Sequence, residues 1–184
     1  MTTKPSQRAD PTRAGRLGPL IRDIPDFPKP GIVFKDITPL LADAAGLALA
    51  VELMAGPFGD CPVDLVVGAE SRGFIFGTAV AQALRCGFVP VRKPGKLPAE
   101  KRSTTYELEY GHDTLEIHID ALGPDHRVLM VDDLLATGGT MKACCDLVEA
   151  SGAEIIGISV LIELAFLNGR ARVVPHEVTS VLKY

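Results

Sequence analysis

The residues that could do chemistry are concentrated in residues 128–140, whose sequence is Val-Leu-Met-Val-Asp-Asp-Leu-Leu-Ala-Thr-Gly-Gly-Thr. The adjacent carboxylates Asp132 and Asp133 can accept hydrogen bonds from vicinal sugar hydroxyls or meet a metal ion bound to a phosphate. The two glycines that follow allow the backbone to close around a phosphate, and the threonines on either side add hydroxyl donors. The pattern predicts a site for a ribose and its phosphate.

The elements around this stretch would present it to a ligand. Residues 128–131 form an apolar run typical of a buried parallel strand, and residues 140–150 have apolar positions at helical spacing. The acids are therefore expected at the carboxyl end of a strand, where open α/β sheets bind ligands. The N-terminus of the following helix offers unpaired N–H groups to an anion. The chain has no Gly-Lys-Ser, Gly-Lys-Thr or Gly-x-Gly-x-x-Gly sequence, which excludes the Walker and Rossmann phosphate loops.

A second polar turn is expected at the same edge of the sheet. Ser71 and Arg72 follow a predicted strand at residues 63–67 and would therefore lie at its carboxyl end. An arginine that caps a turn with its charge in water is the simpler explanation of this pair. Its position beside a predicted phosphate site favours a role in binding a second anionic group.

A basic run with Arg92, Lys93 and Lys96 falls within residues 92–105. The density of Lys, Arg, Pro and Gly in this segment predicts an exposed and mobile loop. A run of charges is most often a solvated surface, so its residue types alone do not assign it to a site.

Composition narrows the class of protein. With 184 residues and 47% hydrophobic content, the chain can bury the core of a single domain. A net charge of -4 argues against a nucleic-acid binder, and the absence of a long apolar run argues against a membrane protein. We expect a soluble, cytoplasmic protein. The four cysteines and four histidines show no metal or catalytic spacing, so buried reduced thiols are expected.

The chain divides into a polar extension and one domain. Residues 1–16 are predicted to be disordered, and residues 17–184 to form a single α/β domain with a mainly parallel sheet covered on both faces. Helices are expected at residues 17–23, 42–54, 73–85 and 140–150. Strands are expected at residues 32–34, 63–67, 88–91, 128–131 and 155–162, with a hairpin at 106–118 and an edge strand at 178–182.

Residues 128–140 closely resemble the phosphoribosyl-pyrophosphate (PRPP) motif of the type I phosphoribosyltransferases. Other segments are similar to one branch of that family, the adenine phosphoribosyltransferases, and fall in the family's order. These segments are residues 24–28 (IPDFP), 30–37 (PGIVFKDI), 68–74 (GAESRGF), 92–98 (RKPGKLP) and 106–111 (YELEYG). The resemblance covers roughly residues 20–183.

The resemblance implies the type I phosphoribosyltransferase fold, a central sheet with flanking helices and a small hood. It implies the transfer of 5-phosphoribose from PRPP to N9 of adenine, which gives AMP and pyrophosphate in purine salvage. It further implies Mg²⁺ carried on the pyrophosphate of PRPP rather than held by protein side chains alone. A homodimer is implied as well, because basic groups commonly cross a dimer interface in this family.

The resemblance also implies a role for individual residues. Ribose and the 5'-phosphate are assigned to Asp132, Asp133, Ala136, Thr137, Gly138, Gly139 and Thr140. Pyrophosphate is assigned to Ser71, Arg72, Arg92, Lys93 and Lys96. Adenine is assigned to Val33, Phe34 and Lys35, and the proton of its imidazole ring to Glu109, with Tyr106 assisting.

Two other functions stay open at this point. Another member of the family could use hypoxanthine, xanthine or orotate, although the segment from Val33 to Lys35 argues against it. A silent regulator could keep the PRPP site as a sensor, but it would need a basic face or an added DNA-binding domain, and this acidic chain has neither.

Overall fold

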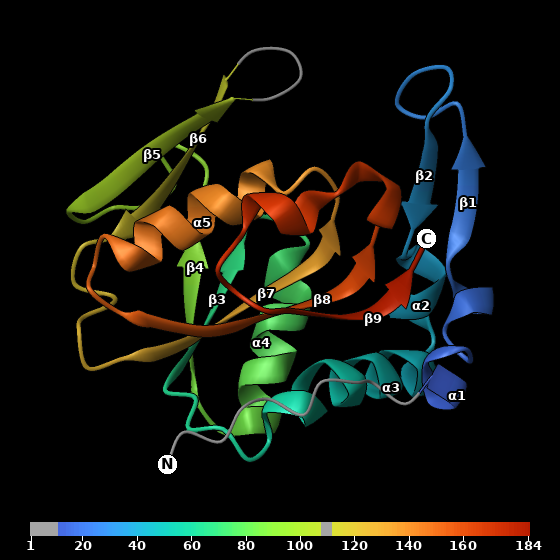
Figure 1. Cartoon of the computed structure of the whole chain (residues 1–184), viewed down its shortest axis with the longest axis horizontal. Helices are drawn as coiled ribbons and strands as arrows, with labels where there is room; N and C mark the ends of the chain where they lie inside the picture. The colour runs from blue at the N-terminus through green and yellow to red at the C-terminus, as the bar shows by residue number, and fades with distance from the viewer. Residues whose placement is uncertain (1–10, 108–111) are drawn as a thin grey trace.

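A five-stranded sheet forms the centre of the computed structural model, which describes residues 11–107 and 112–184 (Figure 1). The first ten residues, part of the predicted disordered extension, lie outside this range. The strand order is β4 (Gly87–Val91), β3 (Leu65–Ala69), β7 (Arg127–Leu135), β8 (Glu154–Glu163) and β9 (Val178–Lys183). All neighbours are parallel, and β9 lies at an edge as predicted.

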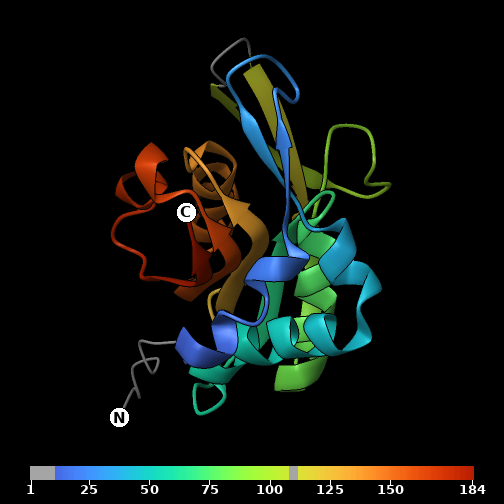
Figure 2. The same ribbon diagram turned by 90° about the vertical axis from the view of Figure 1, so that its right-hand side faces the viewer.

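Helices cover both faces of the sheet, as Figure 2 shows with α5 to the left of the strands and α4 to the right. On one face, α3 (Ala44–Ala55) and α4 (Gly73–Leu84) share a buried cluster with Val66. On the other face, α5 (Gly139–Glu149) packs in a second cluster with Val67. Val66 and Val67 are neighbours in β3, and successive residues of a strand point to opposite faces. Both faces of the sheet are therefore buried under helices. The predicted α/β fold is confirmed.

Two antiparallel hairpins stand above the carboxyl ends of the strands in Figure 1. The first, which we call the hood hairpin, pairs β1 (Arg22–Pro25) with β2 (Val33–Asp36). The second pairs β5 (Lys101–Glu107) with β6 (His112–His118). The short elements are α1 (Pro11–Ala14), η1 (Gly18–Leu20), α2 (Thr38–Ala42), η2 (Gly56–Phe58), η3 (Ala165–Leu167) and η4 (Gly169–Arg172). None of the described helices combines the length and apolar character needed to cross a bilayer.

The predicted disorder through residue 16 needs correction, because residues 11–16 are part of the folded domain. Ala14 of α1 is only 5% exposed and belongs to the cluster under α3. Arg13 donates two hydrogen bonds, of 2.7 and 2.6 Å, to the carboxylate of Glu52 in α3. The polar composition predicted disorder, but contacts with a helix distant in sequence order this segment.

Other boundaries differ because distant segments pair or, at the start of α3, because a local side chain caps the helix. The helix predicted at residues 17–23 is a single η1 turn, because the following residues pair as β1 with β2. The loop predicted through residue 105 ends at residue 100, since β5 pairs with a strand that carries the buried Leu115 and Ile117. The helix predicted at residues 42–54 is divided at Asp43, which caps α3 by accepting a hydrogen bond from the amide of Gly46.

Candidate active site

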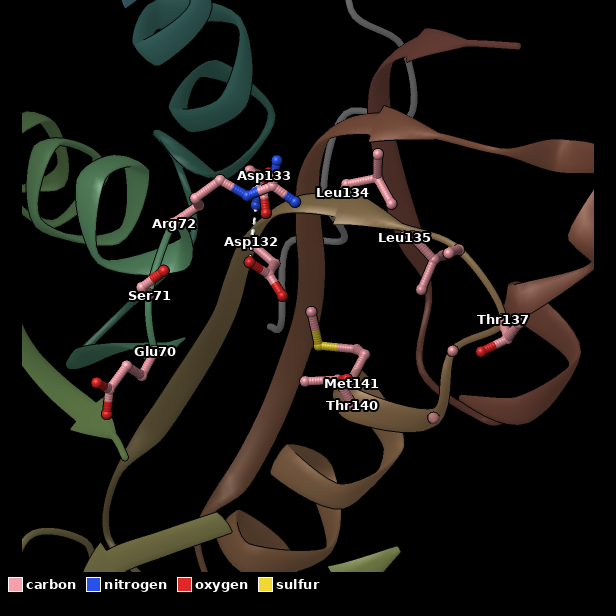
Figure 3. A pocket seen from close by; sticks show the side chains of 13 residues that line it. Glu70, Ser71, Arg72, Asp132, Asp133, Leu134, Leu135, Thr137, Thr140 and Met141 are labelled. Atoms are coloured by element: carbon pink, nitrogen blue, oxygen red, sulfur yellow. Dashed lines mark hydrogen bonds and ion pairs between the residues drawn. The ribbon is translucent and has the colours of Figure 1, made fainter. Parts of the chain in front are cut away.

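A pocket of about 350 Å³ opens at the carboxyl ends of β3 and β7, beside the start of α5 (Figure 3). Two segments far apart in the sequence line it, the turn after β3 and the end of β7 with the loop that follows. The lining residues are Glu70, Ser71, Arg72, Asp132, Asp133, Leu134, Leu135, Ala136, Thr137, Gly138, Gly139, Thr140 and Met141. The structure therefore brings together the predicted acids, glycine loop and polar turn.

The two acids lie within β7 and not beyond its end, which corrects the predicted strand boundary at residue 131. The strand extends because β8 pairs with it as far as Leu135, and Asp132 itself is opposite Val160. Asp133 is 5% exposed, and Asp132 is half-buried. The amide of Asp133 donates a 2.9 Å hydrogen bond to Oδ1 of Asp132. The pair is therefore fixed by the backbone of a central strand.

The electrostatics of the pair favour a ligand that carries hydrogen-bond donors or positive charge. Burial, and then the negative charge of Asp133, raise the pKa of Asp132 well above its ordinary value. Burial also raises the pKa of Asp133, against the opposing effect of Arg72. Nε of Arg72 lies 3.0 Å from Oδ2 of Asp133, yet this buried oxygen accepts no hydrogen bond of acceptable geometry from the described residues. Oδ2 of Asp133 is thus a buried acceptor beside Arg72 whose hydrogen-bonding capacity the described residues leave unused.

The glycine loop after the acids leads directly into α5. Gly138 has a φ of +82°, which a side chain would strain, and α5 begins at Gly139. A β-carbon on Gly138 would lie 2.5 Å from the carbonyl oxygen of Gly169, and one on Gly169 would lie 2.2 Å from that of Ala136. The loop is therefore shaped by close backbone contact with η4. No sequence motif indicated that Gly169 supports the loop.

The turn after β3 lies against the acid pair. A β-carbon on Gly73 would be 2.8 Å from Oδ1 of Asp132, so this glycine lets the turn and the carboxylate approach each other. The side chain of Arg72 extends from the turn toward Asp133 in Figure 3. The peptide bond between Glu70 and Ser71 is cis. The sequence predicts Ser71 and Arg72 at this edge, but no motif in it indicates the role of Gly73.

The basic run is held outside the pocket lining by acidic side chains. Arg92 Nε lies 3.0 Å from Oε2 of Glu70, which also accepts a 3.0 Å hydrogen bond from the amide of Lys93. The ammonium group of Lys93 pairs with Asp113, which raises the pKa of the lysine. Lys96 is exposed. Ser71 and Arg72 therefore line the pocket, whereas the other three predicted pyrophosphate ligands, Arg92, Lys93 and Lys96, do not line it in the described part of this single chain.

The second hairpin contacts the pocket through Tyr106. Its hydroxyl lies 3.1 Å from Oγ1 of Thr140, at the start of α5, and 3.3 Å from Oδ2 of Asp113. Asp113 also pairs with Lys93, so side chains link the basic run to the glycine loop. Asp113 is not among the predicted site residues, because its position next to Lys93 and Tyr106 depends on the register of the β5–β6 hairpin. The predicted catalytic residue Glu109 lies outside the described residues.

The predicted base-binding residues lie on β2 of the hood hairpin. Val33 is 50% exposed, and Phe34 makes an edge-to-face contact with Phe27 at a centroid distance of 5.2 Å. The Arg72 guanidinium lies 5.3 Å from the centre of the Phe34 ring. Arg72 therefore lies between the hairpin and Asp133. The backbone of Lys35 follows in the same strand, next to Phe34.

The cysteines have no part in this pocket. Cys144 and Cys145 are buried in α5, where desolvation raises the pKa of Cys144 well above its ordinary value and that of Cys145 to about 12. Cys86, Cys144 and Cys145 are free thiols, and the described residues contain no cluster of three or more His, Cys, Asp or Glu side chains that could hold a metal ion.

Comparison with known proteins points to one group. The phosphoribosyl transferase domain matches residues 38–182. Adenine phosphoribosyltransferase from Rhodopirellula baltica is 60% identical over 164 residues, 89% of this chain and 80% of that protein. The crystal structure of adenine phosphoribosyltransferase from Thermoanaerobacter pseudethanolicus matches with a TM-score of 0.90 and 50% identity, over 93% of this chain and 99% of that one.

A second solved structure contains ligands. Adenine phosphoribosyltransferase from Saccharomyces cerevisiae, in complex with a dideoxyimino-altritol bisphosphate and adenine, is 38% identical. It matches with a TM-score of 0.88, over 93% of this chain and 99% of that one. Sequence and fold therefore resemble the same group of proteins.

We predict that Asp132→Asn stabilises the ligand-free protein at pH 7. The pKa of Asp132 is higher in the folded protein than in the unfolded chain, where it is about 4, so ionisation of Asp132 opposes folding. The free energy of unfolding therefore falls as the pH rises from about 4 toward the pKa in the folded protein. The amide removes this charge and keeps the Oδ1 acceptor. Urea unfolding should show a stability gain at pH 7 that disappears below about pH 4.

Asp64→Asn serves as the control of opposite sign. Hydrogen bonds from Arg127 lower the pKa of Asp64 to about 2, so its ionised form supports folding at pH 7 and this support is lost as the pH falls toward 2. That variant should lose stability at pH 7. A loss of stability in Asp132→Asn as well would contradict the charge argument.

Proposed function

Because the chain belongs to the adenine phosphoribosyltransferase family, we propose a role in that reaction for each group of its pocket. The protein transfers 5-phosphoribose from PRPP to adenine and forms AMP and pyrophosphate. One observation supports this function above the others: the acid pair, the glycine loop and the Arg72 turn line one pocket. These three groups match the ribose, the 5'-phosphate and the pyrophosphate of a single substrate.

Ribose and the 5'-phosphate are assigned to the end of β7 and its loop. Oδ2 of Asp133 is a buried acceptor that lacks a hydrogen bond, and a ribose hydroxyl would supply one. Asp132 would accept from the vicinal hydroxyl. The amides and hydroxyls of residues 136–140 would bind the phosphate at the N-terminus of α5, where the helix dipole favours an anion.

Pyrophosphate is assigned to Ser71 and Arg72, with Mg²⁺ as its counterion. Mg²⁺ prefers oxygen ligands and usually keeps several waters, one or two carboxylates and substrate phosphates. The carboxylates of Asp132 and Asp133 fit that preference, whereas the described residues offer no cage that would hold the ion alone. When bound, the ion would neutralise charge on the departing pyrophosphate.

Adenine is assigned to the free edge of β2. Val33 lies opposite Pro25, which has no N–H group to donate. In an antiparallel ladder, pairs that exchange two backbone hydrogen bonds alternate with pairs that exchange none. Because Pro25 and Val33 cannot exchange two, the hydrogen-bonded pair is the next one, Ile24 and Phe34. The carbonyl of Val33 and the amide of Lys35 then point away from β1. They would accept from the 6-amino group of adenine and donate to its ring nitrogen, with Phe34 against the ring.

In the reaction, N9 of adenine attacks C1 of the ribose on the face opposite the pyrophosphate and inverts its configuration. The two acids hold the ribose hydroxyls, and Arg72 stabilises charge on the leaving pyrophosphate. Glu109 is proposed to handle the imidazole proton of adenine. Closure of the hood would exclude water, which could otherwise capture the oxocarbenium-like ribosyl centre.

The test of the function is a comparison of bases. Purified protein is incubated with PRPP and Mg²⁺ and with adenine, hypoxanthine, guanine or orotate, and the nucleotide products are separated. We expect AMP, lost when Mg²⁺ is chelated, and discrimination against hypoxanthine of about 10⁴-fold, because its 6-oxo group cannot donate to the Val33 carbonyl. Another nucleotide would refute the base slot, and PRPP binding without any product would favour a regulator.

The role of Glu109 predicts a separation of turnover from binding. Glu109→Gln should lower kcat by about 100-fold or more, since proton transfer contributes at least that much, while the affinity for PRPP stays unchanged. Steady-state kinetics with Glu107→Gln as the matched control would measure this. A kcat within about twofold of the unmodified protein would refute the proton-handling role.

We also propose a homodimer in which Arg92, Lys93 and Lys96 act on the partner's site. The support is that none of them lines the pocket of its own chain. The test is co-expression of Asp133→Asn chains with Lys96→Ala chains. If Lys96 crosses the interface, a mixed dimer has one intact site, because the Lys96→Ala chain keeps its own Asp133 and receives Lys96 from the other chain. Activity should then recover to about a quarter of that of the unmodified dimer, because about half the dimers are mixed. No recovery, or a single-chain mass by light scattering, would refute the shared site.

A further inference from the structure

The side chain of Lys35 is unusually buried for a lysine. It is 12% exposed, although a lysine ammonium group normally remains in water unless it is paired. Its Nζ donates a 2.7 Å hydrogen bond to Oδ1 of Asp23 in β1 and lies 3.8 Å from the centre of the Tyr184 ring. The first contact lies within the hood hairpin, whereas the second joins the hairpin to the chain beyond β9.

Tyr184 is fixed to the central sheet by its own backbone. Its amide donates a 2.9 Å hydrogen bond to the carbonyl of Glu163, and its carbonyl accepts a 2.8 Å hydrogen bond from the amide of Ala165. Burial raises the pKa of its phenol. Figure 1 shows the C-terminal end of the chain beside the lower part of β2. The ring is therefore carried by the sheet and presents its face to a cation carried by the hairpin.

The hood hairpin needs side-chain contacts of this kind, because its two strands pair with each other and with no strand of the central sheet in the described chain. Two aromatic contacts connect β2 to the body of the domain. One places the guanidinium of Arg72 against the ring of Phe34, and the other is the contact of Lys35 with Tyr184. Since adjacent residues of a strand point to opposite sides, the two contacts hold β2 from both faces.

We infer that Tyr184 is a positioning residue for adenine: it holds β2 through Lys35 and so sets the distance between the base slot and the ribose site. The inference rests on the proposed function, in which the Lys35 amide and the Phe34 ring bind adenine. Tyr184 itself acts through Lys35. The groups of the same chain assigned to PRPP are carried by β7, α5 and the β3 turn, and of these only Arg72 touches β2, through Phe34. Binding of PRPP should therefore depend little on Tyr184.

The decisive variants are Tyr184→Ala, Tyr184→Phe and, as a matched control, Lys183→Ala. Lys183 is the neighbouring residue, is exposed and lies 3.7 Å from Glu163. Loss of the ring should raise KM for adenine by about fivefold, the size of a typical cation–π contact, with KM for PRPP and kcat within about twofold. Phenylalanine should restore the KM for adenine, because its ring also has a negative face. The control should match the unmodified protein.

Lys35→Met provides a second route to the same contact, because it keeps the backbone and removes the cation. Lys35→Met also removes the hydrogen bond to Asp23. Combined with Tyr184→Ala, it should raise KM for adenine no further than Lys35→Met alone, since it already removes the contact that Tyr184→Ala removes. Thermal unfolding of every variant separates a folding defect from a change in binding.

The outcomes separate this inference from the proposed function. Unmodified protein that forms no AMP from adenine would refute both. Unmodified protein that is active, with Tyr184→Ala giving an unchanged KM for adenine, would refute only the positioning role. A parallel rise in KM for PRPP would also refute it, because general loosening of the fold would then explain the result. A selective rise for adenine, reversed by Tyr184→Phe, would establish it.

Discussion

Two carboxylates placed side by side at the end of a buried strand are the constraint on which the pocket depends. Withdrawal of a carboxylate from water costs several kcal/mol, whereas a partly exposed ion pair recovers about 1 kcal/mol or less. The contact between Arg72 and Asp133 therefore does not offset the burial of Asp133 and the partial burial of Asp132. The two acids therefore interact unfavourably in the ligand-free protein, and the ribose hydroxyls and Mg²⁺ that we propose as their partners would relieve this interaction.

Close backbone approach is the second requirement of the pocket. Gly73 permits the β3 turn to lie against Asp132, and Gly138 and Gly169 permit the glycine loop to lie on η4. In each case a β-carbon would come within 3 Å of an oxygen atom, so the space exists only because the side chain is hydrogen. The polar groups of the pocket are thus held by central strands and by contacts that leave little freedom, as a preorganised site requires.

The hood hairpin meets this rigid base through side chains, whereas the second hairpin adds two backbone hydrogen bonds, exchanged between Glu116 of β6 and Arg92 directly after β4. Phe34 contacts Arg72, and Tyr106 contacts Thr140. Such contacts cost less to rearrange than strand pairing, because each is worth about 1 kcal/mol. This division gives a fixed pocket on the central sheet and, above it, a hood hairpin that is less firmly held, which suits the base that we propose it binds. A reaction that must admit two substrates and then exclude water benefits from both properties.

The sequence by itself determined the α/β class, the parallel sheet and the chemistry of residues 128–140, since strand periodicity and the acid–glycine pattern are local properties of the chain. It also placed the Arg72 turn at the correct edge of the sheet. Only the tertiary structure decided that Arg13 belongs to the folded domain, that β7 continues through Asp133, and that Gly169 supports the loop. Each of these depends on a partner distant in sequence: α3 for Arg13, β8 for β7, and the Ala136 carbonyl for Gly169. Local composition carries no record of such partners, because their contact energy arises only when the chain is folded.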